Sequence, residues 1–295
     1  MDGFYNYADA LPDAAWACCE PRSTAEFLAE FDPTEPIPQL LRVRGWSIFS
    51  LFEDAMHDDL IGQRQDLNGS VLFELAIENA FGLAPDSGGW IEKLDVQLEV
   101  AFRMFEQWQC IEGKQCSQPC FRVLNLQMSK KSDWPCLKAK AKNCSVVTEW
   151  LATLTPNFVH DELSSVRNVC TQAFNNIWKS IEATKFPNWK LSVEQAEELE
   201  LQRQLALLSY HFLSKRHVSL KQYKFRIRPK YHHWDHGLRR SVRSKVSMSL
   251  FYSFAPEDFM GLIARMCNKV HSVSMSKRAM QRWLLFFFGT LDDEE

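Results

Sequence analysis

An aspartate and a histidine three positions apart are the first residues of this chain whose spacing could serve chemistry. Asp54 and His57 stand in the segment EDAMHDDLIG. At this separation a carboxylate and an imidazole can lie on one face of a helical turn, where the carboxylate can orient the ring or both can meet an ion. A surface histidine among acidic residues has the same pattern, so the pair alone does not distinguish a site from a solvated turn.

A second pair of acids stands near the C-terminus. Glu257 and Asp258 follow Pro256 at the start of an expected helix. Acids in the first turn of a helix interact favourably with its dipole, by roughly 0.3–1 kcal/mol. The same carboxylates could hold divalent ions in a nuclease site, where two metal ions clamp the scissile phosphate. Both interpretations are open at this point.

Two groups of zinc-ligand residue types lack the spacing of a zinc motif. His232 and His236 would share a helix face, but the Glu of an H-E-x-x-H motif is absent. Cys110, Cys116 and Cys120 contain no C-x-x-C pair. We therefore expect no metal ligands among these residues and no bound cofactor.

Basic residues are concentrated between positions 221 and 245, where nine Lys or Arg accompany one Asp. The four cations at positions 224, 226, 228 and 230 alternate with apolar residues, and in an extended strand this places the cations on one face. A basic face with aromatic residues nearby suits contact with phosphates. The residues predicted to bind DNA are Lys224, Arg226, Arg228, Lys230, Arg239, Arg240 and Arg243.

Helices must position most of these residues, because apolar side chains recur at helical spacing through much of the chain. A capping box, Ser192 with Gln195, marks the start of a long helix. Segment 121–127 could be a short strand or extended segment. The expected fold is mainly α, a helical bundle with a short extended segment or two. The main expected helices span residues 66–81, 89–109, 142–154, 161–184, 192–215 and 255–270.

Three regions are expected from the changes in composition. Residues 1–44 are acidic and interrupted by prolines, which predicts loose organisation. Residues 45–220 form the helical domain. Residues 221–295 hold the basic segment and C-terminal helices, which we expect to pack on the helical domain.

The overall composition excludes several classes of protein. Of the 295 residues, 46% are apolar and 24% charged, close to globular averages, so disorder of the whole chain is not expected. No apolar run reaches the roughly 18 residues of a membrane span, and the N-terminus lacks the basic start of a signal peptide. Nine scattered cysteines indicate reduced thiols in the nucleus or cytoplasm.

Charge is distributed unevenly along the chain. The first 100 residues hold 5 Lys or Arg and 19 Asp or Glu, a net charge of −14. The remaining residues hold 29 and 18, a net charge of +11, and the two values sum to −3. Either the basic part binds a polyanion, or the acidic and basic parts pack against each other.

Four short segments, taken in order, resemble the C-terminal part of transposases of the CACTA and Kyakuja–Dileera–Zisupton type. The first resembles their D-x-M-H…L-G segment, and the second a basic turn followed by a helix. The third resembles their K-P-K-x-H-x-x-x-H box, and the fourth an aromatic-x-x-E segment. In this chain the segments are Asp54–Gly62, Trp134–Pro156, Arg228–His236 and Phe254–Phe259, and the resemblance covers about residues 45–290.

This resemblance implies descent from a DDE enzyme, in which an RNase H-like core with three acids holds two metal ions and a helical insertion interrupts the core. Glu257 would match the third acid, and Asp54 with His57 would lie between the second and third. The helices of 66–215 would be the insertion, with a possible remnant of the core beside them. The first two acids would precede Asp54, where the 53 residues show no convincing strand pair.

The expected function is therefore that of a transposon-derived protein without catalytic activity of its own that binds DNA non-specifically. One alternative is a nuclease or transposase subunit completed by another chain, which would need Mg²⁺ or Mn²⁺. The other is a helical interaction module with no nucleic-acid role.

Overall fold

Helices account for most of the described chain, which confirms the prediction of a mainly α fold. They start close to the expected positions because local signals set them: Ser192 and Ser23 each cap a helix with the residue three positions later. Among the described residues there is no β-strand, and Lys190 and Val246 form an isolated bridge. The elements are α1 (Thr24–Leu28), η1 (Gln39–Arg42), η3 (Met56–Gln63), α2 (Arg64–Ile77), α3 (Trp90–Glu112), α4 (Ala141–Leu154), η4 (Thr155–Phe158), α5 (Glu162–Ala183), α6 (Val193–Ser219), α7 (Pro229–Ser244) and η5 (Met248–Phe251).

The computed structural model divides the chain into two compact units, Met1–Phe251 and Tyr252–Glu295. No helix among the described residues has the length and apolar character needed to cross a membrane. The seven cysteines that the structure describes are free thiols. The described residues are 9–11, 13–16, 23–32, 34, 36–47, 54–82, 87–184 and 188–253, with scattered positions between 261 and 284.

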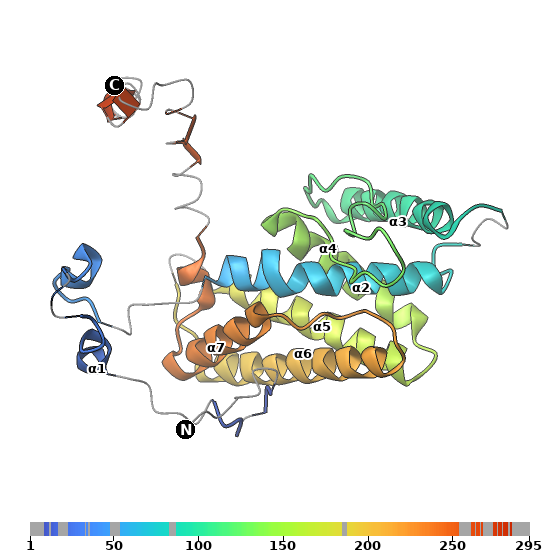
Figure 1. Ribbon diagram of the computed structural model, residues 1–295. Coiled ribbons are helices and arrows are strands. Elements are labelled where there is room, and N and C mark those ends of the chain that lie inside the picture. Colours follow the sequence, from blue (N-terminus) through green and yellow to red (C-terminus); the bar gives the residue numbers. More distant parts are fainter. Residues whose placement is uncertain are drawn as a thin grey trace. The chain divides into compact units, whose positions relative to one another are not determined.

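Helix α2 is the centre of the first unit. It contacts α3, α4 and α5, and Figure 1 shows it crossing between the α3–α4 pair and the layer formed by α5, α6 and α7. Leu67, Val71, Leu72 and Leu75 are fully buried along it. A helix that is buried on every side has apolar residues around its whole circumference rather than along one stripe. Helix α2 also buries polar residues, which need hydrogen-bond or charge partners.

Gly69 lets another part of the backbone approach α2 closely. A Cβ at this position would lie 2.7 Å from the Cα and N atoms of Cys136 and from the N atom of Leu137. The Leu137 N–H donates a hydrogen bond of 2.9 Å to the carbonyl oxygen of Gln65 one turn earlier. The absence of a side chain at residue 69 therefore allows the segment after Trp134 to lie against α2, and the hydrogen bond to Gln65 holds it there.

Gly69→Ala should lower the free energy of unfolding by about 1–3 kcal/mol, the usual cost of overpacking, because backbone atoms cannot move aside as a flexible side chain can. Helix propensity alone predicts the opposite sign, a gain of about 1 kcal/mol. Urea unfolding followed by circular dichroism measures the change. A more stable Ala variant would show that the approach at residue 69 is not tight.

Buried arginines tie the helices together through carboxylates. Arg64 makes two hydrogen bonds of 2.8 Å to Asp59, and Arg203 makes one of 2.6 Å to Asp235. All four of these side chains are almost completely buried. Because a buried charge needs a partner with good geometry, these pairs specify how the elements that carry them pack.

Two segments expected to be extended are not strands, and this corrects the sequence prediction. Within residues 121–127, residues 123–127 form successive turns, and the Val123 N–H donates a hydrogen bond to Asp95 of α3. Residues 222–228 run without regular structure, and Phe225 has a φ of 55°, which no strand residue adopts. The alternation of cations in this segment therefore does not create a basic face of a strand.

Candidate nucleic-acid interface

Three segments that are far apart in the sequence meet at the start of α2. The Arg228 guanidinium donates a hydrogen bond of 3.1 Å to the carbonyl oxygen of Gly62. The segment after Trp134 reaches the same place through the bond between Leu137 and Gln65. These are the first three segments of the transposase resemblance, so its described motifs share one region of the fold. The fourth segment, 254–259, falls among residues that the structure does not describe.

The Asp54–His57 pair forms as its spacing predicted. Asp54 Oδ2 lies 2.5 Å from His57 Nδ1, and Oδ1 accepts a hydrogen bond of 3.0 Å from the Met56 N–H. The carboxylate therefore both accepts a hydrogen bond from the first residue of η3 and orients the imidazole. Glu257 and Asp258 lie outside the described residues, and no group of three or more potential metal-ligating side chains occurs among those that are described.

His232 and His236 pack against an aromatic ring. Their Nε2 atoms are 3.0 Å apart, and the centroid of the Trp16 ring lies 4.4 Å from that of each imidazole. Trp16 also lies under the guanidinium of Arg239, 4.8 Å from the ring centroid. This part of α7 is thus the docking face for the N-terminal segment that holds Trp16.

Two of the seven residues predicted to bind DNA are buried and engaged inside the protein. Lys224 donates a hydrogen bond of 3.1 Å to Glu74. Arg239 pairs with Asp235 at 3.0 Å and donates to the backbone carbonyl oxygen of Leu11. Both cations are balanced by carboxylates, so neither presents its charge to a ligand in this structure.

The other five predicted residues retain some exposure. Arg228 lies 2.5 Å from Asp66 and is about a quarter exposed, and the Lys230 amine lies 3.5 Å from the carbonyl oxygen of Ile61. Arg226 is exposed, while its backbone carbonyl accepts a hydrogen bond from Tyr210. On α7, half-buried Arg240 and exposed Arg243 lie in the last two turns.

Two adjoining cavities lie beside α2, and together we call them the basic groove. The first, the aromatic pocket, has a volume of about 570 Å³. The second, the polar pocket, has a volume of about 470 Å³, and both include Tyr223 in their walls. The cations that line the aromatic pocket are Lys93, Lys131, Lys221 and Lys224, and those that line the polar pocket are Lys130, Arg226 and Arg228.

Four of these cations make no ion pair with another described residue: Lys130, Lys131, Lys221 and Arg226. All four are exposed. The acids that line the polar pocket are Asp66, which pairs with Arg228, and Asp133, which accepts hydrogen bonds from Ser129. The groove therefore carries an excess of positive charge, which attracts anions.

Burial perturbs the pKa values of two groups in the polar pocket, Asp66 and Cys136. It raises the pKa of Asp66 to about 6, although the nearby Arg228 charge lowers it. Burial, and then the Asp66 charge, raise the pKa of the Cys136 thiol to about 12. This raised pKa disfavours the thiolate, which is the form in which a cysteine acts as a nucleophile.

Sequence reasoning missed half of the groove. Lys130 and Lys131 lie within the polar turn of residues 129–133, and Trp90 begins a helix more than a hundred residues before Tyr223. A local signal existed in the adjacent lysines of that turn. Nothing local indicated that the turn would lie opposite residues 221–226, because this depends on how both segments pack on α2.

Comparison with known proteins gives no match: no family model, no curated protein and no solved structure matches this chain. The resemblance of its short motifs to transposases therefore stays a prediction. What the groove can bind has to be inferred from its own side chains, which are mainly cations and aromatic rings.

Proposed function

We propose that this chain is a transposon-derived protein that binds DNA through the basic groove, with little dependence on base sequence. The observation that carries the proposal is the cluster of exposed cations, without ion pairs to other described residues, that two separate segments, 130–131 and 221–226, bring to one side of α2. These cations are Lys130, Lys131, Lys221 and Arg226.

The chemistry of these groups favours phosphate contacts over base recognition. Three of the four are lysines, whose ammonium groups act as point charges on flexible stems. Contacts of this kind position a protein on the nucleic-acid backbone and carry no sequence information. Arg226 is the one guanidinium among them, so bidentate recognition of bases plays little part in the proposal.

The meeting of three resemblance segments at the start of α2 supports the proposed ancestry. Each segment contributes to the walls or anchors of the groove: Arg228 binds the backbone at Gly62, and Trp134 lines the polar pocket. The proposal concerns binding and does not include strand cleavage, for which the chain would need carboxylates held together around metal ions.

Titration of the full chain with a fluorescent DNA oligonucleotide across a salt series, in the presence of EDTA, tests the proposal. Affinity should fall steeply with salt, because each phosphate contact releases counterions. A triple variant, Lys130→Gln with Lys131→Gln and Arg226→Gln, should bind more weakly, and its log–log salt slope should be shallower by about three, roughly one per lost phosphate contact.

The matched control changes three other exposed lysines to glutamine, Lys179, Lys190 and Lys245, which line neither pocket of the groove. It alters the net charge equally, so non-specific attraction alone would weaken both variants to the same extent. Equal losses would contradict the groove as the binding surface. No binding by the wild type at low salt would favour the interaction-module interpretation instead.

A further inference from the structure

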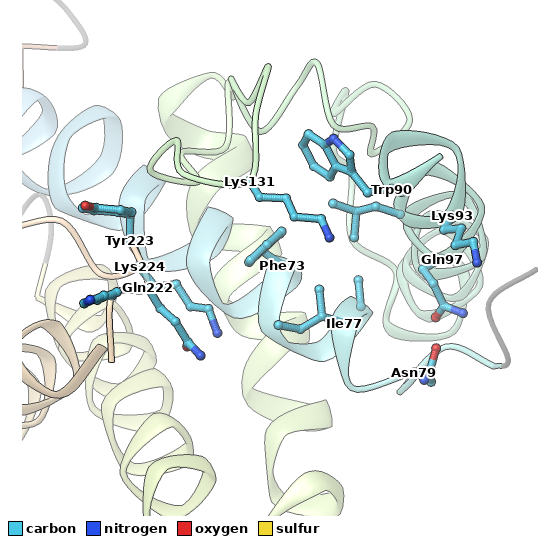
Figure 2. A pocket seen from close by; sticks show the side chains of 13 residues that line it. Phe73, Ile77, Asn79, Trp90, Lys93, Gln97, Lys131, Gln222, Tyr223 and Lys224 are labelled. Atoms are coloured by element: carbon cyan, nitrogen blue, oxygen red, sulfur yellow. The ribbon is translucent and has the colours of Figure 1, made fainter. Parts of the chain in front are cut away.

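The aromatic pocket has two kinds of wall. Figure 2 shows Trp90 of α3 on one side and Tyr223 on the other, with Phe73 and Ile77 of α2 forming the floor between them. Tyr223 is 41% exposed and Ile77 is 50% exposed, so both present surface to a ligand. The pocket thus offers flat and apolar surface at a place where charge is concentrated.

Cationic side chains stand at the edge of the same pocket. Lys131 reaches over Phe73 toward Trp90 in Figure 2, and Lys221 lies in the segment that carries Tyr223. Lys224 is also in the wall, but it is held by Glu74 and stacks over the Phe73 ring at 5.7 Å. A ligand that fills this pocket needs a flat, mostly apolar part and an anionic part beside it.

A nucleotide has this combination, since its base is flat and its phosphate is anionic. The volume of about 570 Å³ falls within the range of small-molecule sites, and is far too small to admit a double helix. In a duplex the bases are stacked and paired inside, so a duplex could offer the groove only its phosphates. An unpaired strand can offer both parts at once.

We propose that the aromatic pocket receives one unpaired base of a DNA strand whose phosphates lie along the basic groove, so that the groove takes single-stranded DNA in preference to duplex. This rests on the proposed DNA binding and specifies its substrate. The base stacks on Trp90 or Tyr223, and the phosphate beside it contacts Lys131 and Lys221.

The polar pocket continues the path of the strand. Trp134 and Tyr223 are in edge-to-face contact, with ring centroids 5.5 Å apart, at the boundary between the two pockets. Beyond them Lys130 and Arg226 provide the next cations. Alternation of aromatic rings with cations along a groove is the arrangement by which proteins bind single strands without sequence preference.

The test compares one mixed-sequence oligonucleotide as a single strand and as a duplex, using fluorescence anisotropy with the full chain at fixed salt. The single strand should bind roughly tenfold more tightly. Trp90→Leu should weaken single-strand binding by roughly tenfold, which lies within the range for removal of one stacking partner, and leave duplex binding unchanged. Trp108→Leu is the matched control, because Trp108 lies on the same helix, is half-buried and does not line the pocket.

A second measurement does not depend on any variant folding. A single strand carrying 5-iodouracil is irradiated in complex with the wild-type chain, and cross-linked peptides are identified by mass spectrometry. Cross-links to Trp90 or Tyr223 support the proposal. Cross-links confined to other aromatic residues overturn it.

The outcomes separate this inference from the function on which it rests. Equal affinity for single strand and duplex, with no effect of Trp90→Leu, overturns the inference and leaves DNA binding by the groove intact. No binding of either form means that the proposed function itself has failed. Displacement of the strand by a free deoxynucleotide monophosphate at the same concentration also overturns the inference, because the pocket would then be a site for free nucleotides.

Discussion

Glu74→Gln should lower the free energy of unfolding by about 3–5 kcal/mol, the usual cost of leaving buried charges without their partner. Glu74 is 4% exposed. Its carboxylate lies 2.7 Å from His217 Nε2, 3.1 Å from the Lys224 amine and 3.3 Å from the Arg167 guanidinium. The glutamine has nearly the same shape but no charge, so Lys224 loses the carboxylate that compensates its burial and Arg167 loses one of its two carboxylate partners.

The same carboxylate should make the protein sensitive to acid. Burial raises the pKa of Glu74, but the hydrogen bond from His217 and the charges of Lys224, His217 and Arg167 outweigh it and lower the pKa to about 2. A lowered pKa in the folded state adds stability above the unfolded value, near 4.5, and this stability is lost as the pH falls through about 2. The Gln variant should lack this part of the acid transition.

Glu78→Gln provides the matched control for urea unfolding at neutral pH. Glu78 also pairs with Arg167, at 2.7 Å, but it is 29% exposed, so water compensates for the loss of its charge. The control should lose less than about 1 kcal/mol. If both variants lost equally little, the buried cluster would contribute nothing beyond an ordinary surface pair.

This cluster also shows how the charge asymmetry of the sequence is used. Glu74 comes from the acidic first part of the chain, whereas Arg167, His217 and Lys224 come from the basic part. Packing of acidic against basic segments therefore accounts for some of the cations. Others, such as Lys131, have no such partner among the described residues and form the excess charge of the groove. Packing of the acidic part against the basic part therefore holds for Arg167 and Lys224, whereas polyanion binding stays a prediction for the cations of the groove.

The helices could be predicted because their signals are local. A capping box and apolar spacing are contained within a few residues, which is why α6 begins at Val193, directly after the expected cap at Ser192. The Asp54–His57 contact was predictable for the same reason, since both residues lie on one turn. No distant part of the chain was needed for either.

The basic groove could not be predicted in the same way. Lys224 and Arg226 are two residues apart, yet one is buried against Glu74 and the other is exposed in the polar pocket. The positive φ of Phe225 between them turns its ring into the core and breaks the alternation that a strand would have. Pro229 at the first position of α7 did offer a local signal, because proline favours a helix start over a strand interior.

Asp66 sets a pH dependence of the opposite sign from that of Glu74. Its pKa is raised to about 6 in the folded state by burial, against an ordinary value of 3.8. The folded state therefore holds the proton more tightly, which adds stability below the unfolded pKa. That stability is lost as the pH rises through about 6, and the shift of about two units corresponds to about 3 kcal/mol in all.

Asp66→Asn should therefore gain stability relative to the wild type as the pH rises, by about 2 kcal/mol between about pH 4.5 and about pH 7.5. The amide keeps the shape of the side chain but has no proton to lose, so urea unfolding of both proteins at each pH isolates this one titration.

Asp133→Asn is the control in the same pocket, because hydrogen bonds from Ser129 lower the pKa of Asp133. The difference in unfolding free energy between this variant and the wild type should stay flat over that range. A flat difference for Asp66→Asn as well would mean that Arg228, 2.5 Å away, stabilises the carboxylate fully. A rising difference would mean that the carboxylate opposes folding at neutral pH, so that Asp66 holds Arg228 beside the groove at a cost in stability.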